Sequence, residues 1–155
     1  MGRSRGGLTT KIYALVDALG RPIRLKLTEG QAHDGRSGAD MVEGIDAGQT
    51  LLAPSHGLHA NHCRATDRAY DSDGLRDMLA ERGAVANIRL MPTRKRLPTF
   101  DPILYRQRNQ VERFFSKIQH FRAVATRYDK RDDNFLASVQ LASLRIWLRT
   151  YESVT

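Results

Sequence analysis

Cysteine is almost absent from this 155-residue chain, in which Cys63 is the single one. A lone cysteine excludes an internal disulfide framework, so a reducing, cytoplasmic location is expected. No stretch approaches the roughly 20 apolar residues of a membrane helix. The apolar stretch after MGRSRGG is short and broken by Asp17, which argues against a signal peptide. Repeats and low-complexity linkers are also lacking, and the length fits one domain over residues 1–155.

Acidic residues are few in the second part of the chain, residues 89–155, but not in the first part. Residues 1–88 hold 11 Lys and Arg against 11 Asp and Glu, whereas residues 89–155 hold 14 against 6, so the whole +8 excess lies there. One-sided basic charge favours a polyanionic partner such as DNA. A solvated basic face without a partner is the alternative. With 41% hydrophobic residues the chain is too apolar for a disordered tail.

The first half of the sequence predicts a hairpin followed by short elements. Residues 8–17 are rich in β-formers, and Ile23, Leu25 and Leu27 alternate with polar residues, which predicts two strands with one buried face. The other expected elements are a loop at 30–34, a short helix at 37–44, a strand at 49–53 and an aperiodic segment at 54–66.

The second half predicts more helix. Residues 71–82 read as a helix that Asp71 or Ser72 can cap and that Gly83 stops. The elements expected after it are a strand at 84–90, a basic loop at 91–102 and helices at 103–122 and 132–151. The order β-β-α-β-α-β-α-α predicts a mixed α/β domain.

The helix at 103–122 carries polar residues beside its apolar stripe. At about 100° per residue, Tyr105, Arg108 and Glu112 share a sector roughly 60° wide at the stripe's edge. A carboxylate, a guanidinium and a phenol are thereby expected on one half-buried edge. The alternative is an ordinary i,i+4 ion pair between Arg108 and Glu112 on the surface.

A second acidic cluster lies in TDRAYDSD, residues 66–73. Asp67 falls just before a helix, a common position for a catalytic or metal-binding carboxylate, because ligands gather outside the carboxyl ends of strands. For Asp71 and Asp73 we favour capping and a favourable interaction with the helix dipole.

Four segments together resemble a known family. They are GRSRGGLTTKIYALVDALG, LTEGQAHD, DRAYDSDGLRDMLAERGA and LYRQRNQVERFFSKIQHFRAVATRYDK. In this order they are similar to the C-terminal portion of insertion-sequence 5 family transposases, of the DDE group with a ribonuclease H-like catalytic domain. The most specific match is to the family's Y-x2-R-x3-E-x6-K signature, through Tyr105, Arg108 and Glu112.

The resemblance implies DNA transposition by phosphoryl transfer, with Mg²⁺ or Mn²⁺ held by three carboxylates. It implies that Asp67 is the second carboxylate and Glu112 the third, and that Tyr105 and Arg108 contact DNA phosphate. As further backbone contacts we add five basic residues from the loop and the following helix: Arg94, Lys95, Arg96, Arg113 and Lys117.

The sequence departs from the family pattern in three places. The strand that bears the family's first catalytic Asp precedes the GRSRGG segment and is not in this sequence; Asp17 and Asp34 do not occupy the motif position. Residues 54–66 look like an insertion that could displace Asp67. Gln119 stands where the signature has Lys.

The insertion also contains His56, His59, His62 and Cys63. Their chemistry suits zinc, but their spacing matches no standard closed site, so a polar loop is the favoured interpretation.

These observations predict a transposase fragment that binds DNA at element ends and target and is inactive alone. Its ribonuclease H-like mixed sheet would lack its first central strand. Its partners would be an upstream transposase product, to which frameshifting would fuse it, or other transposase copies, with no membrane. A decayed or truncated transposase copy is the alternative origin of such a fragment. The rival is a non-catalytic DNA-binding protein or regulator derived from a transposase, and the missing carboxylate disfavours a stand-alone metal nuclease.

Overall fold

The computed structural model describes residues 2–4, 7–30, 40–43, 45, 48–51, 71–127 and 129–152. The chain divides into two compact units: Met1–Gln31 with Asn109–Thr155, and Ala32–Arg108. The predicted mixed α/β class is confirmed, because both units combine strands with helices. A ribonuclease H-like sheet and a single domain over 1–155 remain predictions. No helix in the described ranges is long and apolar enough to cross a membrane.

The sheet of the first unit is antiparallel, in the order β1-β2-β3. Its strands are β1 (Gly2–Ser4), β2 (Gly7–Val16) and β3 (Pro22–Glu29), so the predicted hairpin is confirmed. Burial of Ile23 on its inner face was a wrong expectation, since this side chain is 62% exposed. The register shifts between Leu15 and Val16, which leaves Ile23 without a partner residue. Such a bulge interrupts the in-out alternation of a strand.

The turn between β2 and β3 is held by Asp17. Its Oδ1 accepts hydrogen bonds from the amides of Leu19 and Arg21, both at 2.9 Å, and its Oδ2 accepts one from Arg21 Nε at 2.6 Å. Gly20 adopts φ +76°, in the left-handed region that favours glycine. Asp17 therefore has a structural role in the turn.

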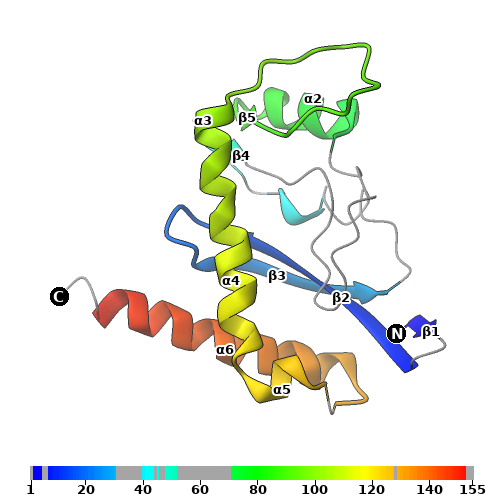
Figure 1. Cartoon of the computed structure of the whole chain (residues 1–155), viewed down its shortest axis with the longest axis vertical. Coiled ribbons are helices and arrows are strands. Elements are labelled where there is room, and N and C mark those ends of the chain that lie inside the picture. The colour runs from blue at the N-terminus through cyan, green and yellow to red at the C-terminus, as the bar shows by residue number, and fades with distance from the viewer. Residues whose placement is uncertain are drawn as a thin grey trace. The chain divides into compact units, whose positions relative to one another are not determined.

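Three helices complete this unit: α4 (Asn109–Gln119), α5 (Arg122–Ala125) and α6 (Asp132–Glu152). The helix α4 crosses the hairpin and contacts β2, while α6 contacts β3 and α5 (Figure 1). Apolar side chains from β2 and from the three helices form the core of the unit. Its buried members are Ile12, Tyr13, Phe114, Phe115, Ile118, Val124, Phe135, Val139, Ala142 and Ile146.

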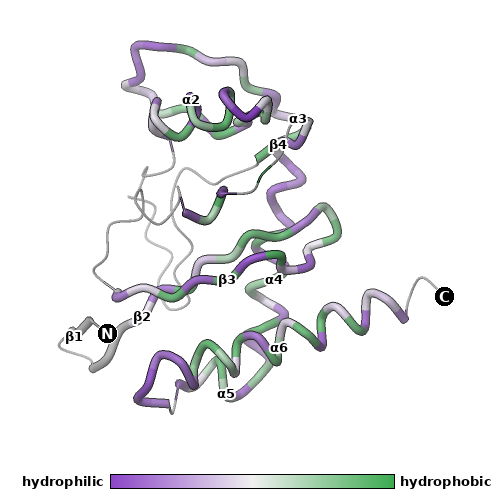
Figure 2. Tube along the Cα trace, turned by 180° about the vertical axis from the view of Figure 1, so that it is seen from behind, coloured by the Kyte–Doolittle hydropathy of each residue, from purple (hydrophilic) through white to green (hydrophobic). Residues whose placement is uncertain are grey.

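The long helix α6 confirms the prediction for 132–151 and is fixed to the hairpin by Trp147. The indole Nε1 donates to the carbonyl of Pro22 at 2.9 Å, and the Arg21 guanidinium carbon lies 4.2 Å from the ring centroid. The opposite face of α6 exposes apolar residues, among them Leu141. Figure 2 shows the contrast between this partly apolar helix and the hydrophilic connection that precedes it.

The second unit contains a parallel pair of short strands, β4 (Thr50–Leu51) and β5 (Val85–Ala86), and the helix α2 (Asp73–Glu81). Ser72 caps α2 by accepting from the Leu75 amide, and Gly83 follows it with φ +70°, as the sequence predicts. The buried apolar residues of this unit are Met41, Val42, Ile45, Leu51, Leu75, Leu79, Ala84 and Ile88.

The strand expected at 84–90 is shorter than predicted. The Asn87 amide still donates to the carbonyl of Leu51 in β4 at 3.0 Å. The carbonyls of Ala86 and Ile88, however, accept hydrogen bonds from the Arg76 side chain, at 3.0 and 2.9 Å. Asn87 also exchanges two hydrogen bonds of 2.9 Å with the backbone of Asp101. Arg76 thus supplies hydrogen bonds to two carbonyl groups of this segment, and the Asn87 side chain ties the segment to Asp101.

The helix expected at 103–122 is interrupted. It consists of α3 (Pro102–Tyr105), the 3₁₀ turn η1 (Arg106–Arg108) and α4, which ends at Gln119. Phe121 is extended, with φ −85° and ψ 113°, and precedes α5. A 3₁₀ turn is tighter than an α-helical turn, so the 100° spacing does not apply across it. The basis of the predicted 60° sector for Tyr105, Arg108 and Glu112 therefore does not hold over 106–108, and the sector itself stays a prediction.

Candidate functional site

Glu112 lies in the first turn of α4, where a carboxylate interacts favourably with the helix dipole. Phe114, Phe115 and Ile118 bury the neighbouring face of this helix and fix its orientation in the first unit. Glu112 is half-buried, as predicted. The packing therefore holds the carboxylate at the edge of the core with access to solvent.

Tyr105 and Arg108 end the second unit and contact each other. Asp101 caps α3 by accepting from the amides of Ile103 and Leu104 at 2.8 and 3.0 Å, which sets the helix start. The Arg108 guanidinium carbon lies 5.5 Å from the Tyr105 ring centroid, and this ring packs on Phe100 at 5.2 Å. Both signature residues are half-buried, and the aromatic contact brings the phenol and the guanidinium together.

The most elaborate charge cluster surrounds Asp71. Arg76 donates to Asp71 Oδ1 from Nε at 3.1 Å and from Nη2 at 2.8 Å. Arg94 Nη1 donates to the same oxygen at 2.9 Å, and the Met91 amide donates to Oδ2 at 2.8 Å. All three side chains are 8% exposed or less. Asp71 is thus a buried structural anion, and Ser72 alone caps the helix.

Burial by itself would raise the pKa of Asp71. The Met91 amide hydrogen bond and the guanidinium groups of Arg76 and Arg94 oppose it, and together they lower the pKa below its usual value of 3.8. The carboxylate consequently stays ionised at neutral pH and holds the loop after β5 against α2.

Arg94 is committed to this cluster. Besides Asp71 it binds Asp73, whose carboxylate is largely exposed. The expected contact of Arg94 with DNA phosphate therefore competes with two carboxylates. Of its neighbours in the basic loop, Arg96 pairs with Asp77 at 3.3 Å on the open surface, and Lys95 is exposed.

Arg113 and Lys117 are exposed on α4, as expected for residues that meet a backbone phosphate. Asp67, the other predicted catalytic carboxylate, lies outside the described residues, as do Asp34 and the histidines and cysteine of the 54–66 segment. No cluster of three or more His, Cys, Asp or Glu side chains suited to a metal occurs within the described ranges. Glu112 is thus the described member of the predicted carboxylate pair.

Sequence reasoning missed one group of basic residues. Arg145 and Arg149, one turn apart on α6, meet Lys117 of α4 at the wall of a cavity. Their i,i+4 spacing was a readable signal, because it places two like charges on one helix face.

The chain belongs to the transposase family with a DDE domain: the family model described as "Transposase DDE domain" matches residues 2–147. Transposases act on DNA, and DDE domains generally use divalent metal ions. A protein of Brucella ovis described as "Putative transposase for insertion sequence element IS6501" is 37% identical over 143 residues. That alignment covers 92% of this chain and 100% of the relative. No solved structure matches the chain.

The prediction of a DDE transposase with DNA transposition as its function is confirmed at this level. Membership of the insertion-sequence 5 family, the C-terminal position within it, and the individual site residues remain predictions.

Proposed function

We propose that this chain takes part in DNA transposition by contributing two carboxylates, Asp67 and Glu112, to a phosphoryl-transfer site. Tyr105 and Arg108 would bind the phosphate beside the reacting bond. The single observation that carries this proposal is the family match over residues 2–147, which includes the Tyr105, Arg108 and Glu112 signature. The contact between Tyr105 and Arg108 and the half-buried position of Glu112 support it.

Carboxylate oxygens are the donors that Mg²⁺ and Mn²⁺ prefer, so Glu112 fits such a site chemically. When bound, two such ions stabilise the attacking and leaving oxygens of an in-line displacement. The resemblance places the first carboxylate of the site on a strand that precedes the GRSRGG segment. We propose that this strand, encoded upstream or supplied by another transposase copy, completes the site.

The basic residues would position the DNA without reading its sequence. Lys95, Arg96, Arg113 and Lys117 are exposed and carry this role in our proposal. Arg94 is paired with Asp71 and Asp73, so a contact of Arg94 with DNA would have to compete with these ion pairs.

An excision assay tests the proposal. A donor plasmid carries a marker between the DNA ends that flank the coding frame, and the chain is supplied either alone or with its upstream DNA. We expect excision only with the upstream DNA, and a loss of about 100-fold or more in Glu112→Gln. Glu152→Gln, which removes a carboxylate from the end of α6, is the matched control. Undiminished excision by Glu112→Gln would refute the proposed role.

One observation favours a second function, a non-catalytic DNA-binding protein or regulator: the whole +8 charge excess lies in residues 89–155, and DNA binding through these charges needs no catalytic carboxylate. This alternative predicts salt-sensitive DNA affinity that survives Glu112→Gln, with no metal-dependent cleavage under any condition. Upstream DNA that encodes no Asp-bearing strand in any frame would favour it further.

A further inference from the structure

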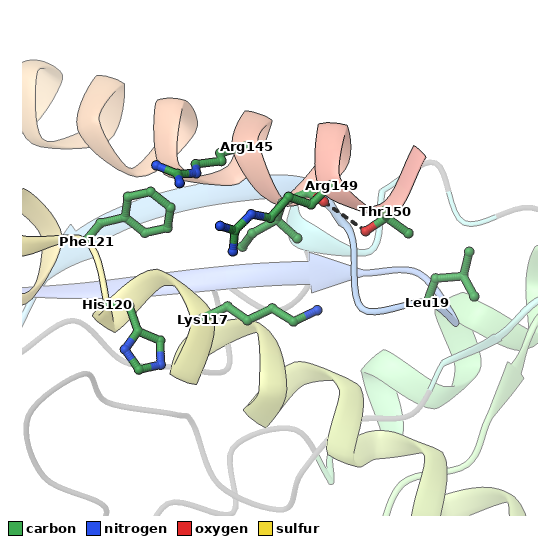
Figure 3. A pocket seen from close by; sticks show the side chains of 8 residues that line it. Leu19, Lys117, His120, Phe121, Arg145, Arg149 and Thr150 are labelled. Atoms are coloured by element: carbon green, nitrogen blue, oxygen red, sulfur yellow. Dashed lines mark hydrogen bonds between the residues drawn. The ribbon is translucent and has the colours of Figure 1, made fainter. Parts of the chain in front are cut away.

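The first unit contains a cavity of about 630 Å³ between the end of α4 and the second half of α6 (Figure 3). Three cationic side chains surround it: Lys117 from α4, and Arg145 and Arg149 from α6. Leu19 from the turn of the hairpin, and His120 and Phe121 after α4, also line it. Because every wall belongs to one unit, the cavity is a property of that unit alone.

The positive charges that line the cavity are not balanced by nearby carboxylates. It contains no Asp or Glu, and among the described residues no carboxylate forms an ion pair with Lys117, Arg145 or Arg149. Two arginines at i and i+4 repel each other and destabilise a helix slightly. Three uncompensated cations facing one hollow therefore suit an anion, and a bound phosphate would relieve their repulsion.

The cavity is too large and too apolar for phosphate alone. Its volume falls within the range of about 300–1,000 Å³ typical of sites for organic ligands. Phe121 and the buried Ile146 form an apolar wall beside the cations, and the Arg145 guanidinium carbon lies 5.8 Å from the Phe121 ring centroid. Aromatic rings and arginine planes are the surfaces on which unpaired bases stack.

We propose that this cavity binds a nucleotide of an unpaired DNA strand. Lys117, Arg145 and Arg149 hold its phosphodiester, and its base packs against Phe121. The choice of DNA as the polymer rests on the proposed function. The cavity, however, lies on a different face of α4 from Glu112. Lys117 is five residues from Glu112 and therefore about 140° around α4.

The test is binding of a fluorescein-labelled single-stranded oligonucleotide, measured by anisotropy across a salt series. Arg145→Gln with Arg149→Gln should weaken binding on the order of tenfold at 0.1 M salt and lower the slope of log K against log salt by about 1.4. The matched control, Arg122→Gln with Lys130→Gln, removes two exposed charges outside the cavity. Equal losses of affinity in the two double variants would mean that the oligonucleotide responds only to the net charge of the protein, and this result would overturn the proposal.

The variant Phe121→Leu tests the contact with the base independently of the contacts with the phosphate. We expect about fivefold or greater loss of single-strand affinity with an unchanged salt slope, and a smaller loss for the duplex of the same sequence. Equal losses for single strand and duplex, or none in Phe121→Leu, would overturn the nucleotide assignment in favour of a backbone site. Circular dichroism verifies folding, and the arginine variants keep the test valid if Phe121→Leu unfolds.

Competition with inorganic phosphate distinguishes a nucleotide site from a site that binds any small anion. The proposal requires the oligonucleotide to resist millimolar phosphate at constant ionic strength, and displacement by phosphate at that level would refute it. In the excision assay, failure of Glu112→Gln to lower excision refutes the catalytic proposal and leaves the cavity result standing. A cavity variant that binds single strands normally refutes this inference and leaves the role of Glu112 standing.

Discussion

Replacing Asp71 by asparagine removes a buried negative charge and leaves its two guanidinium partners in place. Arg76 and Arg94 are each 8% exposed and both lie within 2.9 Å of Asp71 Oδ1. Breaking a buried ion pair by removing one partner costs about 3–5 kcal/mol, because the remaining charges stay uncompensated. Since whole domains have unfolding free energies of about 5–15 kcal/mol, this loss should be obvious.

Urea denaturation followed by circular dichroism measures the effect. Asp73→Asn is the matched control: it removes a carboxylate two residues away that also binds Arg94 but is 59% exposed. Exposed pairs contribute about 0–1 kcal/mol, so the control should shift the midpoint little. Equal shifts in the two variants would refute the structural role of Asp71.

The same cluster sets a pH dependence. Because the pKa of Asp71 is lowered in the folded state, its contribution to stability is complete above the unfolded value of 3.8. That contribution is lost as the pH falls through the lower folded pKa. The stability difference between the wild type and Asp71→Asn should therefore be constant near neutral pH and narrow below about pH 4. A difference that stays constant down to pH 2 would contradict this assignment.

Three further predictions concern stability and are checked by urea midpoints. Val139→Ala on α6 should cost about 2 kcal/mol because the side chain is fully buried, whereas Leu141→Ala, at a 68% exposed position, should stay within about 0.5 kcal/mol. Ser72→Ala should cost about 1 kcal/mol through loss of the α2 cap, and Ser72→Asp should restore it. Gly20→Ala should cost at least about 1 kcal/mol, because φ is +76° and the new Cβ would lie 3.0 Å from Gln110 Oε1. Equal effects at Val139 and Leu141, or a neutral Gly20→Ala, would contradict the packing described above.

The elements that sequence patterns predicted correctly are those with local causes. The hairpin follows from its β-forming residues and their alternation, and α2 follows from Ser72 and Gly83. The strand at 84–90 and the helix at 103–122 came out shorter, because hydrogen bonds from Arg76 and the 3₁₀ turn at 106–108 depend on neighbours that a local pattern does not contain.

The candidate site divides in the same way. Half-burial of Tyr105, Arg108 and Glu112 was predictable, because a residue beside an apolar stripe lies at the edge of a core. The engagement of Arg94 was not, because its partner Asp71 is 23 residues away in sequence. A basic loop looks alike whether its arginines face DNA or a buried carboxylate.

By itself, the sequence determined the mixed α/β class, the basic second half and the transposase signature, since composition, periodicity and spacing are properties of neighbouring residues. Only the tertiary structure decided which charges are used internally and which remain available. In the folded chain Asp71 lies buried between two arginines. Lys117 lies around one cavity with Arg145 and Arg149, which follow it by 28 and 32 residues in the sequence. Long-range packing makes these choices, because the burial of a charge depends on every element that surrounds it.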